Sequence, residues 1–229
     1  VLKMFTDAGL TGFGEPLNYE HGRVVAQAVE DMAEYLVGQD PLQIERHWQT
    51  LYRSSYSRSM PILVGALSGL EMAMWDIAGK VHGQPVWKLL GGSVRDRVRV
   101  YAGFAGPGPG GMAEAALRRV EEGFTALKMC PAAGPVRHVE NPKALREMVA
   151  GVAAVREAVG DEVDLAVDLH RRFSPAMAIL LIKELEPLGL LFAEEPCHPE
   201  NNEALLQISR ATSVPIATGE RHLTRWGFR

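Results

Sequence analysis

The second part of the sequence alternates short apolar segments with segments of helical periodicity, and this alternation restricts the possible folds more than any other feature. The apolar segments, which predict β-strands, are 97–102, 125–129, 163–168, 190–194 and 214–218. The segments between them, which predict helices, are 112–122, 141–158, 175–186 and 201–210. Apolar strands that alternate with helices are typical of βα units that form a parallel sheet. We therefore expect an α/β fold with five βα units over residues 93–229.

Residues 1–92 have a different pattern, which predicts a separate α+β domain that ends near Gly92. Its predicted elements are two strands joined by a turn at Gly9, followed by three helices: 1–5, 11–13, 22–37, 41–52 and 61–82. The last helix is apolar on nearly all sides, which is typical of a buried helix. Because it contains the charged residues Asp76 and Lys80, which can pair at a spacing of four, we expect a core helix and no membrane span.

The composition is that of a globular protein, with 47% hydrophobic and 23% charged residues. A net charge of −4 argues against a nucleic-acid-binding surface. No basic segment precedes an apolar one near the start, so we expect no secretory signal. The two cysteines, Cys130 and Cys197, do not form a disulfide framework, and a reducing cytoplasm is expected.

Three acidic residues recur at equal intervals along the predicted sheet. Asp168, Glu194 and Glu220 are 26 residues apart, and each lies at or just after the carboxyl end of a predicted strand. Equal steps in a right-handed βα array bring such residues to neighbouring strand ends at one edge of the sheet. Adjacent carboxylates repel one another, and a divalent cation removes this conflict; oxygen ligands favour Mg²⁺. The alternative is that these acids cap helices or face solvent.

Two further residues are expected at the same edge. His170 follows Asp168 by two positions, so both side chains lie on one side of the chain. It can be a general acid or base, a metal ligand or a surface residue. Lys128 lies at the end of a predicted strand, where it can neutralise developing charge or pair with the acids. Glu195 is expected on the opposite side of its strand.

Other residues lie on loops after the predicted strands. They can bind an anionic substrate or be solvated loop charges, and the set is Arg171, Arg172, His198, Arg221 and His222. Cys130 is interpreted as a small buried residue and not as a nucleophile. The glycine-rich segment 103–111 is interpreted as a flexible loop, because it lacks the GK[ST] ending of a phosphate-binding loop.

Several segments together carry a resemblance to a known family. They are GLTGFGEP (9–16), ALSGLEMAMWDIAGKVHGQPVWKLLGG (66–92), VDLH (167–170), FAEEP (192–196) and ATGER (217–221). The chain resembles the mandelate racemase subgroup of the enolase superfamily, and is most similar there to galactonate dehydratase and related sugar-acid dehydratases. The resemblance implies an α+β capping domain over 1–92, followed by a (β/α) TIM-type barrel that is incomplete over 93–229.

The resemblance also implies roles for individual residues. The Mg²⁺ ligands are Asp168, Glu194 and Glu220, the acid that protonates a departing hydroxyl is His170, and the contact to the substrate carboxylate is Lys128. We add Arg172 and His222 as candidate substrate contacts. Cys130 stands where racemases and lactonizing enzymes of the superfamily have a second lysine as base, which disfavours that mechanism.

The activity implied is that of a Mg²⁺-dependent hydro-lyase. It would remove the α-proton of a sugar acid such as galactonate and eliminate water to give a 2-keto-3-deoxy acid. One alternative is a racemase or epimerase on the same fold, and another is a non-catalytic metal-binding paralogue or an inactive fragment. We expect a homo-oligomer whose partner is its small-molecule substrate.

Family members are longer than this sequence. They have three more βα units, which supply a His–Asp dyad, and an additional strand before Val1. We therefore expect the general base beyond Arg229. Five strands cannot close a barrel, so we expect these 229 residues alone to be inactive and poorly soluble.

Overall fold

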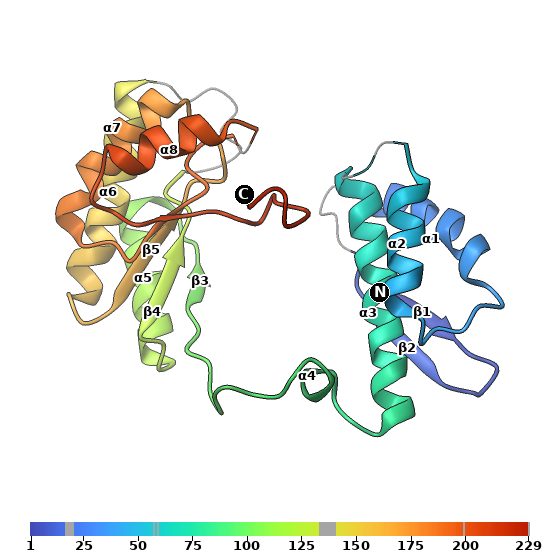
Figure 1. Cartoon of the computed structure of the whole chain (residues 1–229). Helices are drawn as coiled ribbons and strands as arrows, with labels where there is room; N and C mark the ends of the chain where they lie inside the picture. Colours follow the sequence, from blue (N-terminus) through green and yellow to red (C-terminus); the bar gives the residue numbers. More distant parts are fainter. Residues whose placement is uncertain (17–20, 57, 59, 133–140, 199, 229) are drawn as a thin grey trace. The chain divides into compact units, whose positions relative to one another are not determined.

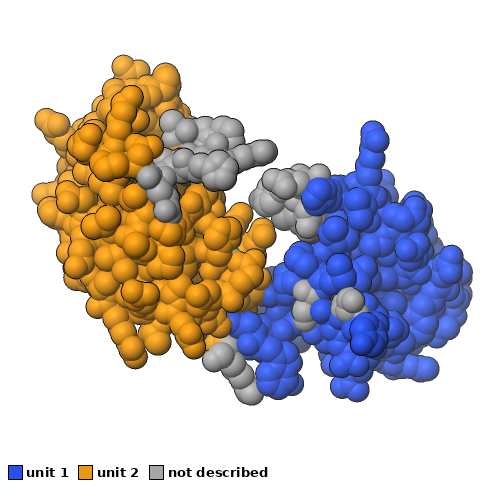
Figure 2. Space-filling model, turned by 90° about the horizontal axis from the view of Figure 1, so that it is seen from above, with its two compact units in different colours: residues 1–97, 223–227, 229 blue, residues 98–222, 228 orange. Residues whose placement is uncertain are grey.

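A computed structural model of the chain describes residues 1–16, 21–56, 58, 60–132, 141–198 and 200–228. The chain divides into two compact units, which are coloured separately in Figure 2. The first comprises residues 1–97 and 223–227, and the second comprises residues 98–222 and Phe228. The division along the chain falls between Arg97 and Val98, whereas the sequence places the boundary near Gly92.

The first unit contains the predicted hairpin and helices. Its elements are β1 (Leu2–Phe5), β2 (Thr11–Gly14), α1 (Gly22–Leu36), α2 (Ile44–Ser54), α3 (Pro61–His82) and the short α4 (Val86–Leu89). The strands pair antiparallel, with Phe5 opposite Thr11. The sequence pattern does not predict α4, because one turn between Pro85 and Gly91 is too short to show periodicity.

Helix α3 is the core of the first unit. Its residues Ala66, Leu67, Ala73 and Met74 are at most 1% exposed. In the described part of the chain it is the one helix long and apolar enough to cross a membrane, but 56% of its most apolar stretch is buried inside the unit. It packs against both strands and against α1 and α2, which accounts for its apolar composition. The predicted ion pair between Asp76 and Lys80 is confirmed, with 2.7 Å between Oδ2 and Nζ.

The second unit is a parallel sheet with one helix after each of its first four strands, as predicted. The strands, in spatial order, are β3 (Ala102–Phe104), β4 (Ala126–Met129), β5 (Asp164–Asp168), β6 (Ala193–Glu194) and β7 (Ile216–Ala217). The helices are α5 (Gly108–Glu121), α6 (Pro142–Val159), α7 (Pro175–Leu185) with the 3₁₀ turn η1 (Glu186–Leu188), and α8 (Asn202–Arg210). Spatial order equals sequence order, so each βα unit lies beside the next (Figure 1).

Two local predictions in this unit are wrong. The strand predicted over 97–102 begins only at Ala102, because β3 lies at the sheet edge and its pairing with β4 covers three residues. The segment 103–111, predicted as a flexible loop, contains the start of α5 at Gly108. Its Pro109 lies in the first turn, where a missing N–H costs no intrahelical hydrogen bond.

Alternation along the strands separates two faces of the sheet. Leu127, Leu165 and Val167 belong to the hydrophobic core that the sheet forms with α5–α8. The helices cover this face in Figure 1. Because successive strand side chains point to opposite faces, the residues between them, among them Lys128 and Asp168, lie on the other face. Three of the predicted site residues meet at the carboxyl end of that face: Lys128, Asp168 and Glu194.

Candidate functional site

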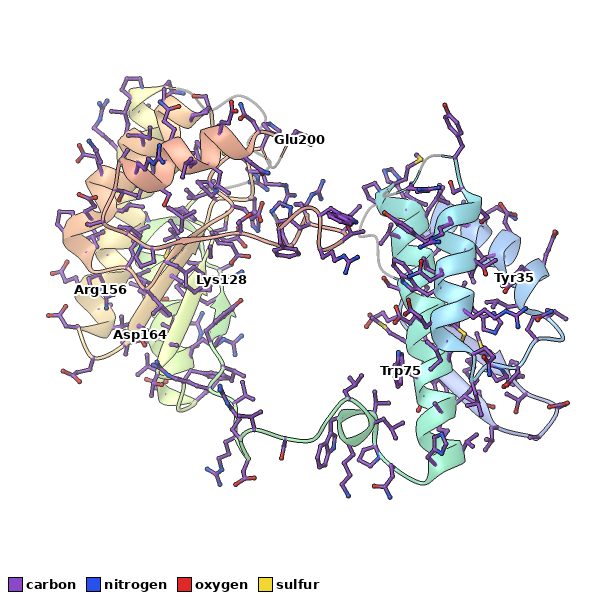
Figure 3. The ribbon with its side chains drawn as sticks, in the orientation of Figure 1. Tyr35, Trp75, Lys128, Arg156, Asp164 and Glu200 are labelled. Carbon is purple, nitrogen blue, oxygen red and sulfur yellow. The ribbon has the colours of Figure 1, made fainter. Side chains whose placement is uncertain are left out.

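Three charged residues lie together at the carboxyl ends of β4, β5 and β6, and we call them the charge cluster: Lys128, Asp168 and Glu194. Asp168 and Glu194 are the last residues of their strands and are register partners. The Nζ atom of Lys128 donates a hydrogen bond to Asp168 Oδ2 at 3.0 Å and another to Glu194 Oε2 at 2.6 Å. Two carboxylates therefore meet at one positive charge on the open face of the sheet, where Figure 3 marks Lys128.

Burial makes the charge cluster electrostatically strong. The side chains of Lys128, Asp168 and Glu194 are 20%, 8% and 17% exposed. Burial alone would lower the pKa of Lys128, but its hydrogen bonds to Glu194 and Asp168 and their negative charges outweigh burial and raise that pKa above its ordinary value. The ammonium group is therefore charged at every physiological pH.

Two aromatic rings lie beside the charge cluster. The ring centroid of Tyr101 is 5.3 Å from Lys128 Nζ and 6.2 Å from the ring centroid of Phe192, with an edge-on geometry. Sequence reasoning missed this pair. The spacing along the strands could have indicated it. Phe192 precedes Glu194 by two positions. Tyr101 precedes Gly103 by two positions, and Gly103 is the register partner of Lys128. Strand alternation thus places both rings on the side of the sheet that bears the charges.

His170 is attached to the charge cluster through Asp168. Its backbone N–H donates to Asp168 Oδ1 at 3.0 Å, and its Nε2 lies 3.3 Å from Asp168 Oδ2. A carboxylate beside Nε2 favours the tautomer that carries its proton there. The other ring nitrogen, Nδ1, is buried and has no hydrogen-bond partner among the described residues. Nδ1 is therefore the ring nitrogen that no described residue engages.

Glu220 has a different partner from the other two acids. It follows β7, and its Oε1 forms an ion pair with Nη1 of Arg171. Among the residues that the structure describes, no three His, Cys, Asp or Glu side chains are grouped closely enough to hold a metal ion. Binding of one ion by Asp168, Glu194 and Glu220 stays a prediction.

The donor set nevertheless fits Mg²⁺. The candidate ligands are carboxylate oxygens, which this ion prefers. Asp168 and Glu194 already direct one oxygen each toward a single cation, the ammonium group of Lys128. Glu220 lies beyond the end of β7, the strand that pairs with β6, and would be the third ligand.

Three of the remaining candidates, His222, Arg172 and His198, lie near other residues. The His222 ring packs against Phe228 with 4.9 Å between centroids, and Arg172 lies close enough to Cys130 to act on its thiol. Burial raises the pKa of the Cys130 thiol, and Arg172 opposes this only in part, so Cys130 is a poor nucleophile. His198 is an exposed loop residue whose Nδ1 is 3.8 Å from Glu200 Oε2.

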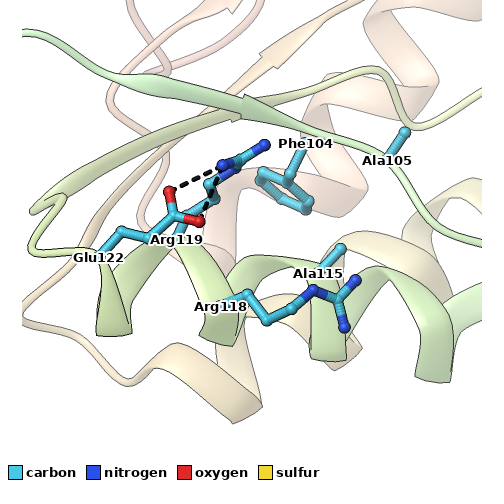
Figure 4. A pocket seen from close by; sticks show the side chains of 6 residues that line it. All are labelled: Phe104, Ala105, Ala115, Arg118, Arg119 and Glu122. Carbon is cyan, nitrogen blue, oxygen red and sulfur yellow. Dashed lines mark hydrogen bonds and ion pairs between the residues drawn. The ribbon is translucent and has the colours of Figure 1, made fainter.

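A pocket of about 180 Å³ lies between β3 and α5 and contains none of the predicted site residues. Its lining residues, shown in Figure 4, are Phe104, Ala105, Ala115, Arg118, Arg119 and Glu122. Arg119 is paired with Glu122 at 2.7 Å. The pocket is separate from the charge cluster, and we assign it no chemistry.

Comparison of the sequence with known protein families shows which superfamily the chain belongs to. Residues 1–91 match the N-terminal domain of the mandelate racemase / muconate lactonizing enzyme family, and residues 111–229 match the enolase C-terminal domain-like family. The chain belongs to the enolase superfamily. The capping domain and the parallel α/β barrel strands of that superfamily are the two units described above.

Solved structures of enolase superfamily members agree with this fold. A Mesorhizobium loti protein with a provisional dehydratase assignment is 38% identical, with a TM-score of 0.93 over 99% of this chain and 64% of that protein. A mandelate racemase/muconate lactonizing enzyme from a Sulfitobacter species is 35% identical, with a TM-score of 0.92 over 99% of this chain and 61% of that one. An enolase from Pantoea ananatis with bound D-gluconate and Mg is 30% identical, with a TM-score of 0.86 over 97% of this chain and 61% of that one. The chain therefore spans less than two thirds of the length of these relatives.

Proposed function

We propose that the complete protein is a Mg²⁺-dependent dehydratase of a sugar acid. The observation that carries the proposal is the convergence of Asp168 and Glu194 on one cation, with His170 hydrogen-bonded to the same aspartate. The dehydratase assignment of a relative and the D-gluconate and Mg bound by another support this choice of reaction and substrate class. Galactonate remains one candidate within that class.

The residues of the chain have distinct tasks in this proposal. Asp168, Glu194 and Glu220 would hold the metal ion, which stabilises the negative charge that develops when the α-proton of a carboxylate leaves. The Lys128 ammonium group binds the substrate carboxylate, because it is permanently charged and faces the open side of the sheet. His170 would act as the general acid in its doubly protonated form: Nε2–H stays with Asp168, the Nδ1 proton passes to the departing β-hydroxyl group, and the ring is left neutral.

In this proposal the general base belongs to a part of the complete protein outside the described residues. Among the described residues, Cys130 occupies the position of a lysine base in related racemases, and its thiol has a raised pKa that opposes thiolate formation. Dehydration also requires an acid for the leaving group, and His170 fills that role. An epimerase that uses a histidine base is the second candidate, and the experiment below separates the two.

The full-length protein is to be screened against aldonic acids, beginning with D-gluconate and D-galactonate, with and without EDTA. We expect a 2-keto-3-deoxy acid that forms only in the presence of Mg²⁺. In D₂O, His170→Asn should reduce dehydration by about 10²-fold or more, while exchange of the substrate α-proton continues. Exchange without loss of water in the wild type would favour the epimerase, and equal loss of both processes in His170→Asn would remove His170 as the acid.

A further inference from the structure

A buried glutamate lies directly behind the charge cluster. Glu195 follows Glu194 in sequence, and it is 1% exposed. Its Oε1 accepts hydrogen bonds from Thr218 Oγ1 at 2.9 Å and from the backbone N–H of Gly219 at 3.0 Å. A carboxylate is costly to bury unless such donors compensate it. Glu195 therefore binds the two residues that directly precede Glu220.

The backbone of Glu195 joins a second loop to this arrangement. Its carbonyl oxygen accepts a hydrogen bond from the backbone N–H of Arg171 at 2.6 Å, and its own N–H donates to Ala217 at 2.9 Å. Arg171 is the residue whose guanidinium group holds the Glu220 carboxylate. Glu195 thus contacts the segment before Glu220 and also the backbone of its ion-pair partner.

Backbone strain is concentrated at the same place. In the described part of the chain, three non-glycine residues have a positive φ: His170 at 48°, Arg171 at 61° and Glu195 at 46°. Left-handed conformations are unfavourable for such residues and persist where surrounding bonds hold them, commonly at functional sites. The backbone and side-chain hydrogen bonds of Glu195 can hold such left-handed residues in place.

We propose that Glu195 is a positioning residue, which fixes segment 218–219 against the end of β6 and so sets the position of Glu220 and the affinity of the site for a divalent cation. The inference rests on the proposed function, because it takes Glu220 as a metal ligand. Oε1 of Glu195 is engaged by the loop after β7, and the proposal gives this side chain no role as a metal ligand.

The chain contains a matched control for this arrangement. Glu186 Oε1 accepts hydrogen bonds from Thr212 Oγ1 at 2.7 Å and from Ser213 N at 2.7 Å. This is the same pair of donors, a threonine hydroxyl and the next backbone N–H, but the bonded segment precedes β7 instead of following it. Glu186 is more exposed than Glu195, and its loss would remove the same two types of hydrogen bond at the opposite end of the strand from Glu220.

The test measures Mn²⁺ binding to the full-length protein by electron paramagnetic resonance, in parallel with thermal unfolding of the metal-free protein. Glu195→Leu should weaken Mn²⁺ binding about tenfold or more, because Thr218 and Gly219 lose the buried acceptor that fixes them against the end of β6. Glu195→Gln keeps an acceptor oxygen and should stay within about threefold of the wild type. Glu186→Leu should lower the melting temperature and leave the Mn²⁺ affinity unchanged.

Equal Mn²⁺ affinity in Glu195→Leu and Glu186→Leu would overturn the inference. If Glu195→Leu does not fold, Thr218→Val and its counterpart Thr212→Val make the same comparison with one bond removed from each pair. Glu220→Gln separates the two proposals. If Glu220→Gln binds Mn²⁺ as the wild type does, Glu220 is not a ligand and the site formed by Asp168, Glu194 and Glu220 is refuted. If Glu220→Gln loses binding while both Glu195 variants retain it, the positioning role alone is refuted.

Discussion

Lys128 stands between two acids that would otherwise repel each other. Its ammonium group is within 3.0 Å of an oxygen of Asp168 and of Glu194, and all three side chains are largely buried. Removal of one partner from a buried ion pair leaves an uncompensated charge, which costs more than the pair contributes. Lys128 therefore supplies the positive charge that offsets both carboxylates at this place in the fold.

Lys128→Met should lower the free energy of unfolding of the metal-free full-length protein by about 1–3 kcal/mol, less than for a fully buried pair because the lysine is partly exposed. Added Mg²⁺ should restore more stability to the variant than to the wild type, as measured by urea unfolding.

A raised pKa in the folded state means that Lys128 stabilises the fold fully below its unfolded pKa of about 10.4. The difference between wild type and variant should thus be constant from about pH 7 to 9 and shrink above about pH 10.4. A difference that shrinks between pH 7 and 9 would contradict this assignment.

The positions of site residues could be predicted from sequence where they depend on strand ends. Lys128, Asp168 and Glu194 meet because β4, β5 and β6 are parallel neighbours, and apolar strand patterns show this. The pairing of Arg171 with Glu220 could not be predicted, because it depends on a left-handed residue in a loop. Hydrophobic periodicity does not indicate a left-handed backbone conformation, and arginine is not a residue type that favours this conformation.

At the scale of elements, β2 and α3 approach each other closely at glycine residues. A Cβ atom on Gly12 would collide with the Ala73 carbonyl, and one on Gly14 would collide with the Gly69 carbonyl. A Cβ on Gly69 would in turn meet the Pro16 ring at 2.6 Å. These glycines lie in two of the segments that carry the family resemblance, and the close packing of strand on helix explains their presence there.

Gly14→Ala should therefore lower the free energy of unfolding by about 1–3 kcal/mol, since the added methyl group meets backbone that cannot rotate away. Gly22→Ala is the control: it lies at the start of α1, a Cβ atom added there would have nothing within 4 Å, and a helical alanine should be neutral or stabilising by about 0.4–1 kcal/mol. Chemical denaturation of both variants measures the difference. Equal stability of the two would show that β2 shifts away from α3 without cost.

The elements themselves could be predicted where hydrophobic periodicity is long. Helix α3 and the buried strands β4 and β5 follow the pattern within a residue or two. Periodicity does not define β3, because at the sheet edge hydrogen bonding to one neighbour decides where the strand begins. Segment 97–101 has the composition of a strand, yet Arg99 instead binds Thr125 and Asp164 through its guanidinium group.

For the whole molecule, the described sheet has two edges, β3 and β7, and each of these strands pairs with one neighbour. Apolar side chains next to β3 are exposed: Val98 by 71%, Val100 by 60% and Tyr101 by 45%. Unpaired strand edges beside exposed apolar residues are sites of self-association. The relatives, which are longer than this chain, have further residues with which to cover such surfaces.

We therefore predict that residues 1–229 expressed alone form concentration-dependent oligomers or aggregates, whereas the full-length protein gives a single species in size-exclusion chromatography with light scattering. Replacement of Val98 and Val100 by lysine should reduce association of the 1–229 chain, because charge at a strand edge opposes edge-to-edge pairing. The matched control places lysine at Val37, an exposed residue of the first unit, and should leave association unchanged. A monodisperse and catalytically active 1–229 chain would contradict the prediction and would place the general base within residues 1–229.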